Sequence, residues 1–259
     1  AGSGRLACDV LTELETLGAL PTCYAILEVS PDLRARQQAT LAETVPHLLP
    51  RVTWLEALPE QFSGVLLANE VLDALPVQVV HWTDTGILER GVAVDADTLI
   101  WADRPIRSPA LRAAADVLPV CAPYCSEISL AAPALVQSLG ERLTAGALCF
   151  IDYGFNRAEF YHLQREQGTL KVHYRHHSLD DPFWLPGLCD LTAHVDFSAI
   201  AEAGATAGLD LLGYATQGRF LLDAGLLDVL GRMVPGTPEY VRAALAVQKL
   251  VQPHEMGEL

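Results

Sequence analysis

The sequence is poor in basic residues. It carries 17 Lys and Arg against 32 Asp and Glu, a formal net charge of −15. Because nucleic-acid binding needs clustered Lys and Arg to meet the phosphates, this balance argues against a nucleic-acid partner and favours a basic protein segment. Long apolar runs are lacking too. No stretch approaches the about 20 residues of a membrane-spanning helix, so no membrane partner is expected.

Paired cysteines and metal-ligand motifs are also scarce. Of six cysteines, only Cys121 and Cys125 lie close in sequence, and no second close pair or His-x-x-x-His motif accompanies them. We therefore expect no metal site and interpret the cysteines as free thiols in a reducing compartment. Four histidines occupy a polar stretch without a carboxylate at motif spacing, which favours solvated or substrate-lining roles: His162, His173, His176 and His177.

The chain otherwise has a globular composition, with 259 residues, of which 51% are hydrophobic and 19% charged. This length suits a single α/β domain over residues 1–259. Helical and strand patterns alternate along most of the chain, which is typical of a parallel sheet with helices on both faces. Helices are expected at 5–17, 30–41, 108–117, 128–143, 195–204, 220–232 and 239–250, and strands at 23–28, 51–55, 64–68, 146–151 and 209–214.

Three segments depart from this alternation. Residues 77–107 contain two β-branched, alternating runs, at 77–82 and 86–94, which predict an inserted meander. Residues 153–191 are polar, aromatic and His-rich, and a segment of this length inside a compact protein is usually functional or mobile. Residues 218–252 predict a helical segment near the end of the sequence.

Polar groups recur where expected strands begin or end. The glycine turn Ala1-Gly2-Ser3-Gly4 precedes the first helix, Glu28 ends a strand, and Asn69-Glu70 and Asp152 end two later ones. Because ligands of parallel sheets bind at the carboxyl ends of the strands, we expect these groups at one edge. The glycines let the backbone approach a ligand, and Glu28 can accept two ribose hydroxyls. The alternative for the glycines is an ordinary turn, and the alternative for Glu28 is an acid that caps a helix. The alternative for the whole pattern is a NAD-dependent dehydrogenase.

Several stretches carry a more specific signal. Asn-Glu-x-x-Asp-Ala-Leu-Pro occupies 69–76 and Asp-Leu-Thr-Ala-His-Val-Asp-Phe occupies 190–197. Shorter matches lie in order along the chain, at 1–4, 27–34 with Gln37, 151–154, 168–170, 180–182 and 253–257. In these stretches the chain resembles the MidA family of class I S-adenosylmethionine-dependent methyltransferases, which includes a mitochondrial protein-arginine methyltransferase that assists respiratory complex I assembly.

The resemblance implies a Rossmann-like class I methyltransferase sheet with inserted substrate-recognition segments. It also implies S-adenosyl-L-methionine as cofactor. Family members extend beyond both ends of this sequence, so we expect a fragment of a longer protein. The residues expected on the cofactor side are Gly2, Ser3, Gly4, Glu28, Val29, Trp54, Leu55, Asn69 and Glu70.

Three residues are expected in catalytic roles. Glu70 and Asp73 can hold a guanidinium, because carboxylates match its fork and keep the attacking nitrogen available. Asp73 is equally explained as a helix N-terminal charge. His194 is four residues after Asp190, so on a helix the two would share a face, and His194 would act as general base or orient Asp190. A buried structural histidine is the alternative.

The resulting functional prediction is an S-adenosylmethionine-dependent methyltransferase acting on a protein arginine. Two rivals stay open. One is methylation of another nitrogen or of a small molecule. The other is a non-catalytic assembly factor for a respiratory-type complex that uses the fold only to bind the cofactor. We expect a cytoplasmic location, or the mitochondrial matrix if the source is eukaryotic.

Overall fold

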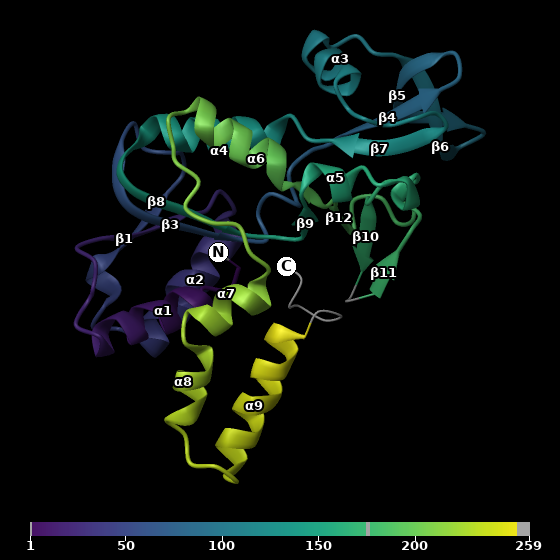
Figure 1. Cartoon of the computed structure of the whole chain (residues 1–259). Coiled ribbons are helices and arrows are strands. Elements are labelled where there is room, and N and C mark those ends of the chain that lie inside the picture. Colours follow the sequence, from purple (N-terminus) through teal and green to yellow (C-terminus); the bar gives the residue numbers. More distant parts are fainter. Residues whose placement is uncertain (1, 175–176, 253–259) are drawn as a thin grey trace. The chain divides into compact units, whose positions relative to one another are not determined.

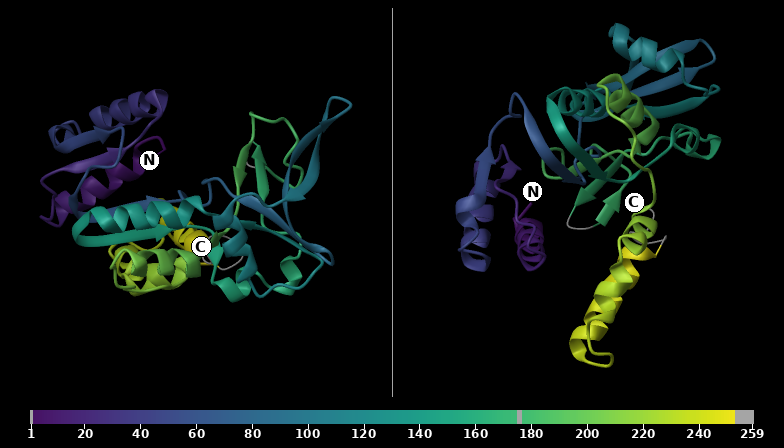
Figure 2. Two further views of the ribbon diagram at one scale, coloured as in Figure 1. Left: turned by 90° about the horizontal axis from the view of Figure 1, so that it is seen from above. Right: turned by 60° about the vertical axis from the view of Figure 1, so that its left-hand side comes forward.

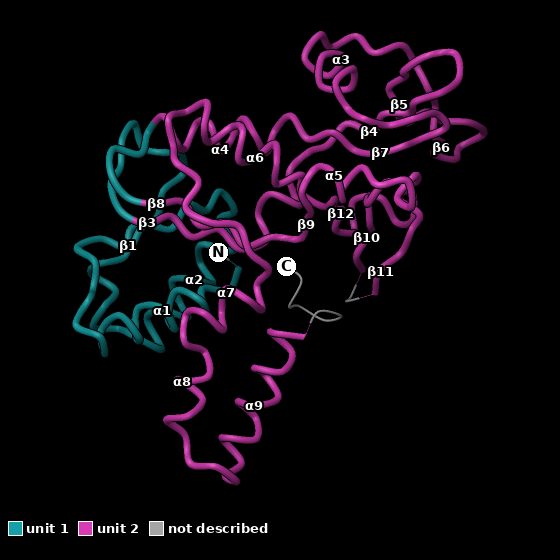
Figure 3. The backbone as a smooth tube through the Cα atoms, in the orientation of Figure 1, with its two compact units in different colours: residues 1–64, 142–146 teal, residues 65–141, 147–259 magenta. Residues whose placement is uncertain are grey.

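The computed structural model of the chain describes residues 2–174 and 177–252 (Figure 1). Ala1, His176 and the 253–257 motif lie outside these ranges. The chain divides into two compact units, residues 1–64 with 142–146 and residues 65–141 with 147–259 (Figure 3). The division falls inside two hydrogen-bonded strands, β3 (Phe62–Asn69) and β8 (Leu143–Ile151).

The first unit confirms the helix and strand order expected near the N-terminus. Its elements are α1 (Arg5–Thr16), β1 (Tyr24–Leu27), α2 (Pro31–Thr44), the short 3₁₀ helix η1 (Leu49–Arg51) and β2 (Val52–Leu55). Strands β1 and β2 pair in parallel, with Tyr24 opposite Val52. The apolar stripes of the helices meet the strands in one core: Ala7, Cys8, Leu11, Ile26, Leu41, Val45, Leu48 and Val52.

Two glycines let β3 and β8 approach closely within this unit. Gly64 and Gly146 have φ angles of 131° and 137°, in the region that side-chain-bearing residues avoid. A Cβ atom on Gly146 would lie 1.8 Å from the carbonyl oxygen of Gly64. Any larger residue at position 146 would therefore have to push the two strands apart.

The second unit contains the predicted meander as part of a larger antiparallel sheet. Strands β4 (Gln78–Thr83), β5 (Gly86–Asp95), β6 (Thr98–Pro105) and β7 (Tyr124–Ile128) form it in the order β6-β5-β4-β7. Helix α3 (Pro109–Asp116) contributes Leu111 and Ala115 to the apolar core of this sheet. The expected strands are confirmed as β4 and β5. Strand β6 was not expected, because its apolar residues, 99–102, are consecutive and do not alternate with polar ones.

The expected helix at 128–143 begins too early. Residues 124–128 form β7, whose five residues are all buried, and α4 runs only from Ala131 to Arg142. The antiparallel pairing of β7 with β4, which places Gln78 opposite Ile128, explains the error. A strand partner more than 40 positions away in the sequence overrides local helical pattern.

The segment 153–191 is built from short elements rather than one long loop. It contains β9 (Gly154–Phe155), α5 (Arg157–Phe160), η2 (Leu163–Arg165), β10 (Lys171–Tyr174) and β11 (His177–Leu179), and it ends on β12 (Asp190–Thr192). Strand β10 pairs antiparallel with both β11 and β12. Strand β9 pairs in parallel with β13 (Val195–Asp196), which leads into α6 (Phe197–Thr206).

The C-terminal part differs from expectation at two points. The strand expected at 209–214 is absent among the described residues, and Leu211 and Leu212 are exposed there. The helix expected at 220–232 is instead two helices, α7 (Gln217–Asp223) and α8 (Leu226–Gly231), because Gly225 adopts φ 92° between them. Helix α9 (Pro238–Val251) packs against both, as the views in Figure 2 show.

Helix capping in the second unit gives a stability prediction. The Oγ of Ser108 accepts a hydrogen bond from the Leu111 amide at the start of α3. Replacing Ser108 with Ala should lower the free energy of unfolding by about 1 kcal/mol, because the amide loses its partner. Urea unfolding measures this, with Ser178→Ala on the exposed strand β11 as control. Equal stabilities of the two variants would contradict the prediction.

Candidate active site

In the first unit, Gln37 joins the glycine turn to Glu28. Its side chain is fully buried, and its Nε2 donates to the Gly2 carbonyl at 3.1 Å and to Glu28 Oε2 at 2.9 Å. The other carboxylate oxygen of Glu28 accepts from the Ser30 amide at 2.9 Å. The structure therefore brings together the turn and the acid that the sequence placed 24 or more positions apart, and it fixes the carboxylate on both oxygens.

The sequence analysis names Gln37 only in a stretch that matches the family, and it did not predict that Gln37 joins the glycine turn to Glu28. It lies between Leu33 and Leu41 at four-residue spacing, so it is a polar residue on the inward face of α2, which was the available signal. Its Oε1 accepts from Trp54 Nε1 at 3.0 Å. A Cβ on Gly4, whose φ is 85°, would lie 3.0 Å from the Cα of Gln37, so this close approach requires glycine.

The Glu28 carboxylate is held in its charged form. Burial raises its pKa, but the hydrogen bonds from the Ser30 amide and the Gln37 side chain favour the anion and leave the pKa below its ordinary value. At neutral pH the group therefore presents acceptor oxygens, as recognition of a vicinal diol requires.

The other residues expected on the cofactor side have mixed surroundings. Ser3 and Val29 are exposed, beside the turn and beyond β1 respectively. Leu55 ends β2, and its carbonyl accepts from the Glu28 amide at 3.1 Å. Trp54 packs against the core of the first unit, and its expected place on the cofactor side stays a prediction.

In the second unit, Asp152 connects the ends of β3 and β8. The residue is 2% exposed. Its Oδ2 accepts from the amides of Val71 and Leu72 at 3.0 and 2.8 Å, and its Oδ1 accepts from the Tyr153 amide at 3.0 Å. Burial, partly opposed by these hydrogen bonds, raises its pKa. The role of Asp152 in this structure is to shape the chain that carries the neighbouring acids.

Glu70 is the first residue of that chain, and its backbone is strained. Its φ is 49°, in the left-handed region that non-glycine residues rarely adopt. Its amide donates to the Ile151 carbonyl at 2.8 Å, and its Oε1 accepts from Asn69 Nδ2 at 3.2 Å. Glu70 and Asn69 are both exposed, so the strained turn presents a carboxylate and an amide to solvent.

Asp73 is a buried acid of the second unit whose pKa departs strongly from its ordinary value. It is 6% exposed. Burial raises its pKa from 3.8 to about 6, and the charges of Asp152, Glu70 and Asp190 add to this effect. We call Glu70, Asp73, Asp152 and Asp190 the carboxylate cluster. These four acids concentrate negative charge at the ends of β3 and β8 and the start of β12. A bound cation would relieve their mutual repulsion.

His194 lies outside any helix, so the expected shared helical face with Asp190 is wrong. Asp190 is on β12, opposite His173 of β10, and His194 follows in the link to β13. The imidazole instead lies against aromatic rings, parallel to Tyr153 at 6.4 Å between centroids and tilted against Phe155 at 5.1 Å. The long-range β10–β12 pairing displaced the helix that the 190–197 spacing had suggested.

The imidazole of His194 is kept neutral. Burial lowers its pKa, and the positive charges of Arg165 and Lys171 lower it further. Its Nδ1 is buried and has no hydrogen-bond partner within residues 2–174 and 177–252. A neutral imidazole with one unengaged nitrogen can accept a proton.

Within the described part of the chain, no group of three or more His, Cys, Asp or Glu could hold a metal ion. Of the histidines in the polar segment, His162 uses its Nδ1 to accept from the Gln164 amide, and His173 lies opposite Ser178 on β11.

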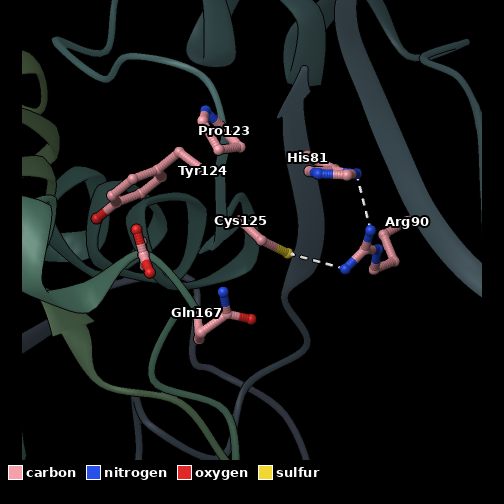
Figure 4. Close-up of a pocket in the computed structure, with 7 residues that line it drawn as sticks. His81, Arg90, Pro123, Tyr124, Cys125 and Gln167 are labelled. Carbon is pink, nitrogen blue, oxygen red and sulfur yellow. Dashed lines mark hydrogen bonds between the residues drawn. The ribbon is translucent and has the colours of Figure 1, made fainter. Parts of the chain in front are cut away.

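A polar cavity of about 160 Å³ lies beside the antiparallel sheet (Figure 4). Arg90 contacts both His81 and the Cys125 thiol there. Its guanidinium is also paired with Asp103 at 2.8 Å, and this pairing lowers the pKa of Asp103 to about 2. Sequence reasoning did not find this cluster. Because Arg90 is already neutralised by Asp103, we assign the cluster a role in holding β4, β5, β6 and β7 together.

Comparison with known proteins identifies the class of the chain. Its sequence matches over residues 1–215 the family described as "Putative S-adenosyl-L-methionine-dependent methyltransferase". Two Burkholderia thailandensis crystal structures are each 50% identical and cover the whole chain. One has a TM-score of 0.96 over 70% of its own length, and the other, bound to S-adenosyl-homocysteine, has 0.95 over 67%. These likenesses define a Rossmann-like α/β methyltransferase fold, as predicted.

The chain belongs to this family, whose description is putative S-adenosyl-L-methionine-dependent methyltransferase, and the predicted class of protein is therefore confirmed. Curated relatives include the mitochondrial protein arginine methyltransferase NDUFAF7 of Danio rerio, 28% identical, and of Mus musculus, 31% identical, each over 99% of this chain. The chain spans 65% and 63% of the lengths of these two proteins. None of the helices in the described ranges is long and apolar enough to cross a membrane.

The raised pKa of Asp73 gives a testable pH dependence. Because its folded-state pKa lies above the ordinary value, the folded protein holds an extra proton between roughly pH 4 and 6. This group's contribution to stability therefore falls as pH rises through that window and is constant above it. Asp73→Asn should remove the dependence.

The difference in unfolding free energy between wild type and Asp73→Asn should change by at most about 3 kcal/mol across the window, since one pKa unit corresponds to about 1.4 kcal/mol. Urea unfolding at a series of pH values measures it. The exposed Asp95→Asn variant is the control and should follow the wild type. A difference that stays constant with pH would refute the environment assigned to Asp73.

Proposed function

We propose that the chain methylates an arginine side chain of a protein, using S-adenosyl-L-methionine. The observation that carries this proposal is the carboxylate cluster, in which one acid, Asp73, is buried beside three others and has its pKa raised to about 6. A guanidinium is a planar cation with several donors that match carboxylate oxygens. The positive charge of a guanidinium would neutralise part of the negative charge of the carboxylate cluster, whereas a neutral methyl acceptor would not.

The first unit supports the cofactor part of the proposal. The close approach of Gly4 to α2 would be blocked by a Cβ, and Glu28 holds its carboxylate ionised through Ser30 and Gln37. These features fit a ligand that carries a ribose diol and passes close to the backbone. We therefore assign Glu28 to the ribose and the turn from Gly2 to Gly4 to the amino-acid end. When bound, S-adenosyl-L-methionine supplies an electrophilic methyl group on a sulfonium.

The second unit supplies groups for the acceptor. Glu70 and Asp73 would hold the guanidinium by charge-assisted hydrogen bonds and orient one nitrogen for attack. Transfer would form a carbon–nitrogen bond as the methyl–sulfur bond breaks and leaves a neutral thioether, and the methylated nitrogen would then have a proton to lose. His194, which is neutral and has an unengaged Nδ1 among the described residues, would accept it. Tyr153 contacts His194 and would border the acceptor.

The names of the curated relatives favour arginine in a protein over another nitrogen or a small molecule. The assembly-factor alternative makes a different prediction, because it requires the cofactor site and not the carboxylate cluster. The expected location, cytoplasmic or in the mitochondrial matrix, stays a prediction beside this proposal.

Cofactor binding is tested by calorimetric titration of S-adenosyl-L-methionine. Replacing Glu28 with Ala should weaken binding by about 10- to 100-fold, because hydrogen bonds to a charged group contribute about 1.5–3 kcal/mol. The exposed Glu43→Ala variant on α2 is the matched control and should bind as the wild type does. Saturable binding that Glu28→Ala leaves unaltered would exclude the ribose assignment. Absence of binding by the wild type would count against the cofactor proposal.

Methyl transfer is tested with radiolabelled S-adenosyl-L-methionine and protein extract from cells that lack this chain, followed by analysis for methylarginines. Glu70→Gln should lower transfer by at least about tenfold, and by more than it weakens cofactor binding, because it removes one charge-assisted contact to the guanidinium. The exposed Glu60→Gln variant should retain full activity.

The possible outcomes separate the rival functions. Label in methyllysine or in small molecules would replace arginine as the acceptor. Cofactor binding without any transfer, together with an intact cellular phenotype of Glu70→Gln, would favour the assembly factor.

A further inference from the structure

Three successive amides connect the candidate acceptor residues to one another. The amide of Ala193 donates to the Asp73 carbonyl at 3.0 Å, that of His194 to Thr169 Oγ1 at 3.0 Å, and that of Val195 to the Tyr153 carbonyl at 2.8 Å. Two of these hydrogen-bond acceptors, the carbonyls of Asp73 and Tyr153, belong to residues of the site proposed for the methyl-accepting side chain. The third, the Thr169 hydroxyl, belongs to a segment with no direct part in that site.

The Thr169 hydroxyl is engaged on both sides. It donates to Glu127 Oε2 at 3.1 Å while it accepts from the His194 amide. A hydroxyl has one hydrogen, so donation to Glu127 turns its lone pairs toward the His194 backbone. Replacing the hydroxyl with a methyl group would leave the His194 amide without this acceptor.

Glu127 is a rigid anchor for Thr169. It is 3% exposed and lies on the fully buried strand β7, opposite Val79 of β4. Besides the Thr169 hydroxyl, its carboxylate accepts from the amides of Thr169 at 2.9 Å and Leu170 at 3.1 Å. A buried carboxylate without such donors would be costly, so the 168–170 segment and Glu127 depend on each other.

Close packing leaves this segment little freedom. Gly168 has φ 77°, and a Cβ at this position would lie 2.3 Å from Glu127 Oε1. The Tyr161 hydroxyl donates to the Glu127 carbonyl at 3.1 Å and braces β7 from another side. The position of the Thr169 hydroxyl is thus defined by the antiparallel sheet, and through it the position of the His194 backbone.

We propose that Glu127 and Thr169 are positioning residues that hold the His194 imidazole against Tyr153 for its role as proton acceptor. This inference rests on the proposed function for the role of His194, whereas the positioning itself can be measured without any activity. Neither residue touches the acceptor. They act through the His194 amide, and so on a ring that lies parallel to Tyr153 and tilted against Phe155.

The test compares Thr169→Val, which keeps the shape and removes the hydroxyl, with Thr169→Ser, which keeps the hydroxyl. Thr40→Val on α2 is the control: Thr40 is half-buried, and its hydroxyl donates to the Arg36 carbonyl, remote from this network. The first readout is the NMR signal of the His194 ring in protein with labelled histidine, assigned through His194→Gln. Arg165 and Lys171 are the charged groups that act on this ring, and both are unchanged in every variant.

We expect the His194 ring resonance and its titration midpoint to move in Thr169→Val, the midpoint upward as the ring becomes less buried. They should stay at wild-type values in Thr169→Ser and Thr40→Val. In the transfer assay, Thr169→Val should lower kcat by about tenfold with little change in KM for S-adenosyl-L-methionine, because a misplaced base affects the reaction more than cofactor binding. Thr169→Ser should restore kcat. If Thr169→Val does not fold, Thr169→Ala replaces it in the same comparison.

The outcomes distinguish this inference from the proposed function. A His194 signal that is identical in Thr169→Val and wild type overturns the positioning inference whatever the activity. So does a signal that moves equally in Thr169→Val and Thr169→Ser. A signal that moves only without the hydroxyl, in a protein that transfers no methyl group, supports the positioning and rejects the proposed function.

Discussion

The buried carboxylate of Asp152 is the interaction on which the acceptor side of the second unit depends. By accepting from the amides of Val71, Leu72 and Tyr153, it joins the chain after β3 to the chain after β8. That connection sets the turn on which Glu70 and Asp73 lie. It also fixes Tyr153, whose carbonyl and ring then meet the 193–195 segment. Burial of this carboxylate is tolerated because its oxygens accept hydrogen bonds from these three amides.

The same arrangement places like charges together. Burial raises the pKa of Asp73, and the charges of Asp152, Glu70 and Asp190 raise it further. Structural ion-pair networks usually alternate charges, as Arg157 does with Asp196 and Glu202 elsewhere in this unit. Acids grouped without a basic partner are more typical of functional sites that bind a cation. The first unit shows the opposite design, in which hydrogen bonds to Glu28 favour its charge.

Local signals in the sequence sufficed for most elements and for the strand-end acids. The helix expected from residue 30 begins at Pro31, and the Ser30 side chain caps it by accepting from the Leu33 amide. The missed features depend on partners far along the chain. Strand β7 is defined by pairing with β4, and Glu127 inside it is satisfied by residues more than 40 positions later. Gln37 and Thr169 were visible in matched stretches, but their bonds to Glu28 and His194 follow only from tertiary structure.

The backbone of Glu70 has a consequence for how this protein can change. At φ 49°, glycine or asparagine would fit the turn with less strain than glutamate, by about 1 kcal/mol or more. The substitutions that would stabilise this turn are therefore ones that delete the exposed carboxylate. Stability and the proposed chemistry therefore favour different residues at this position. Selection for stability alone would tend to replace Glu70 with a residue that lacks the carboxylate.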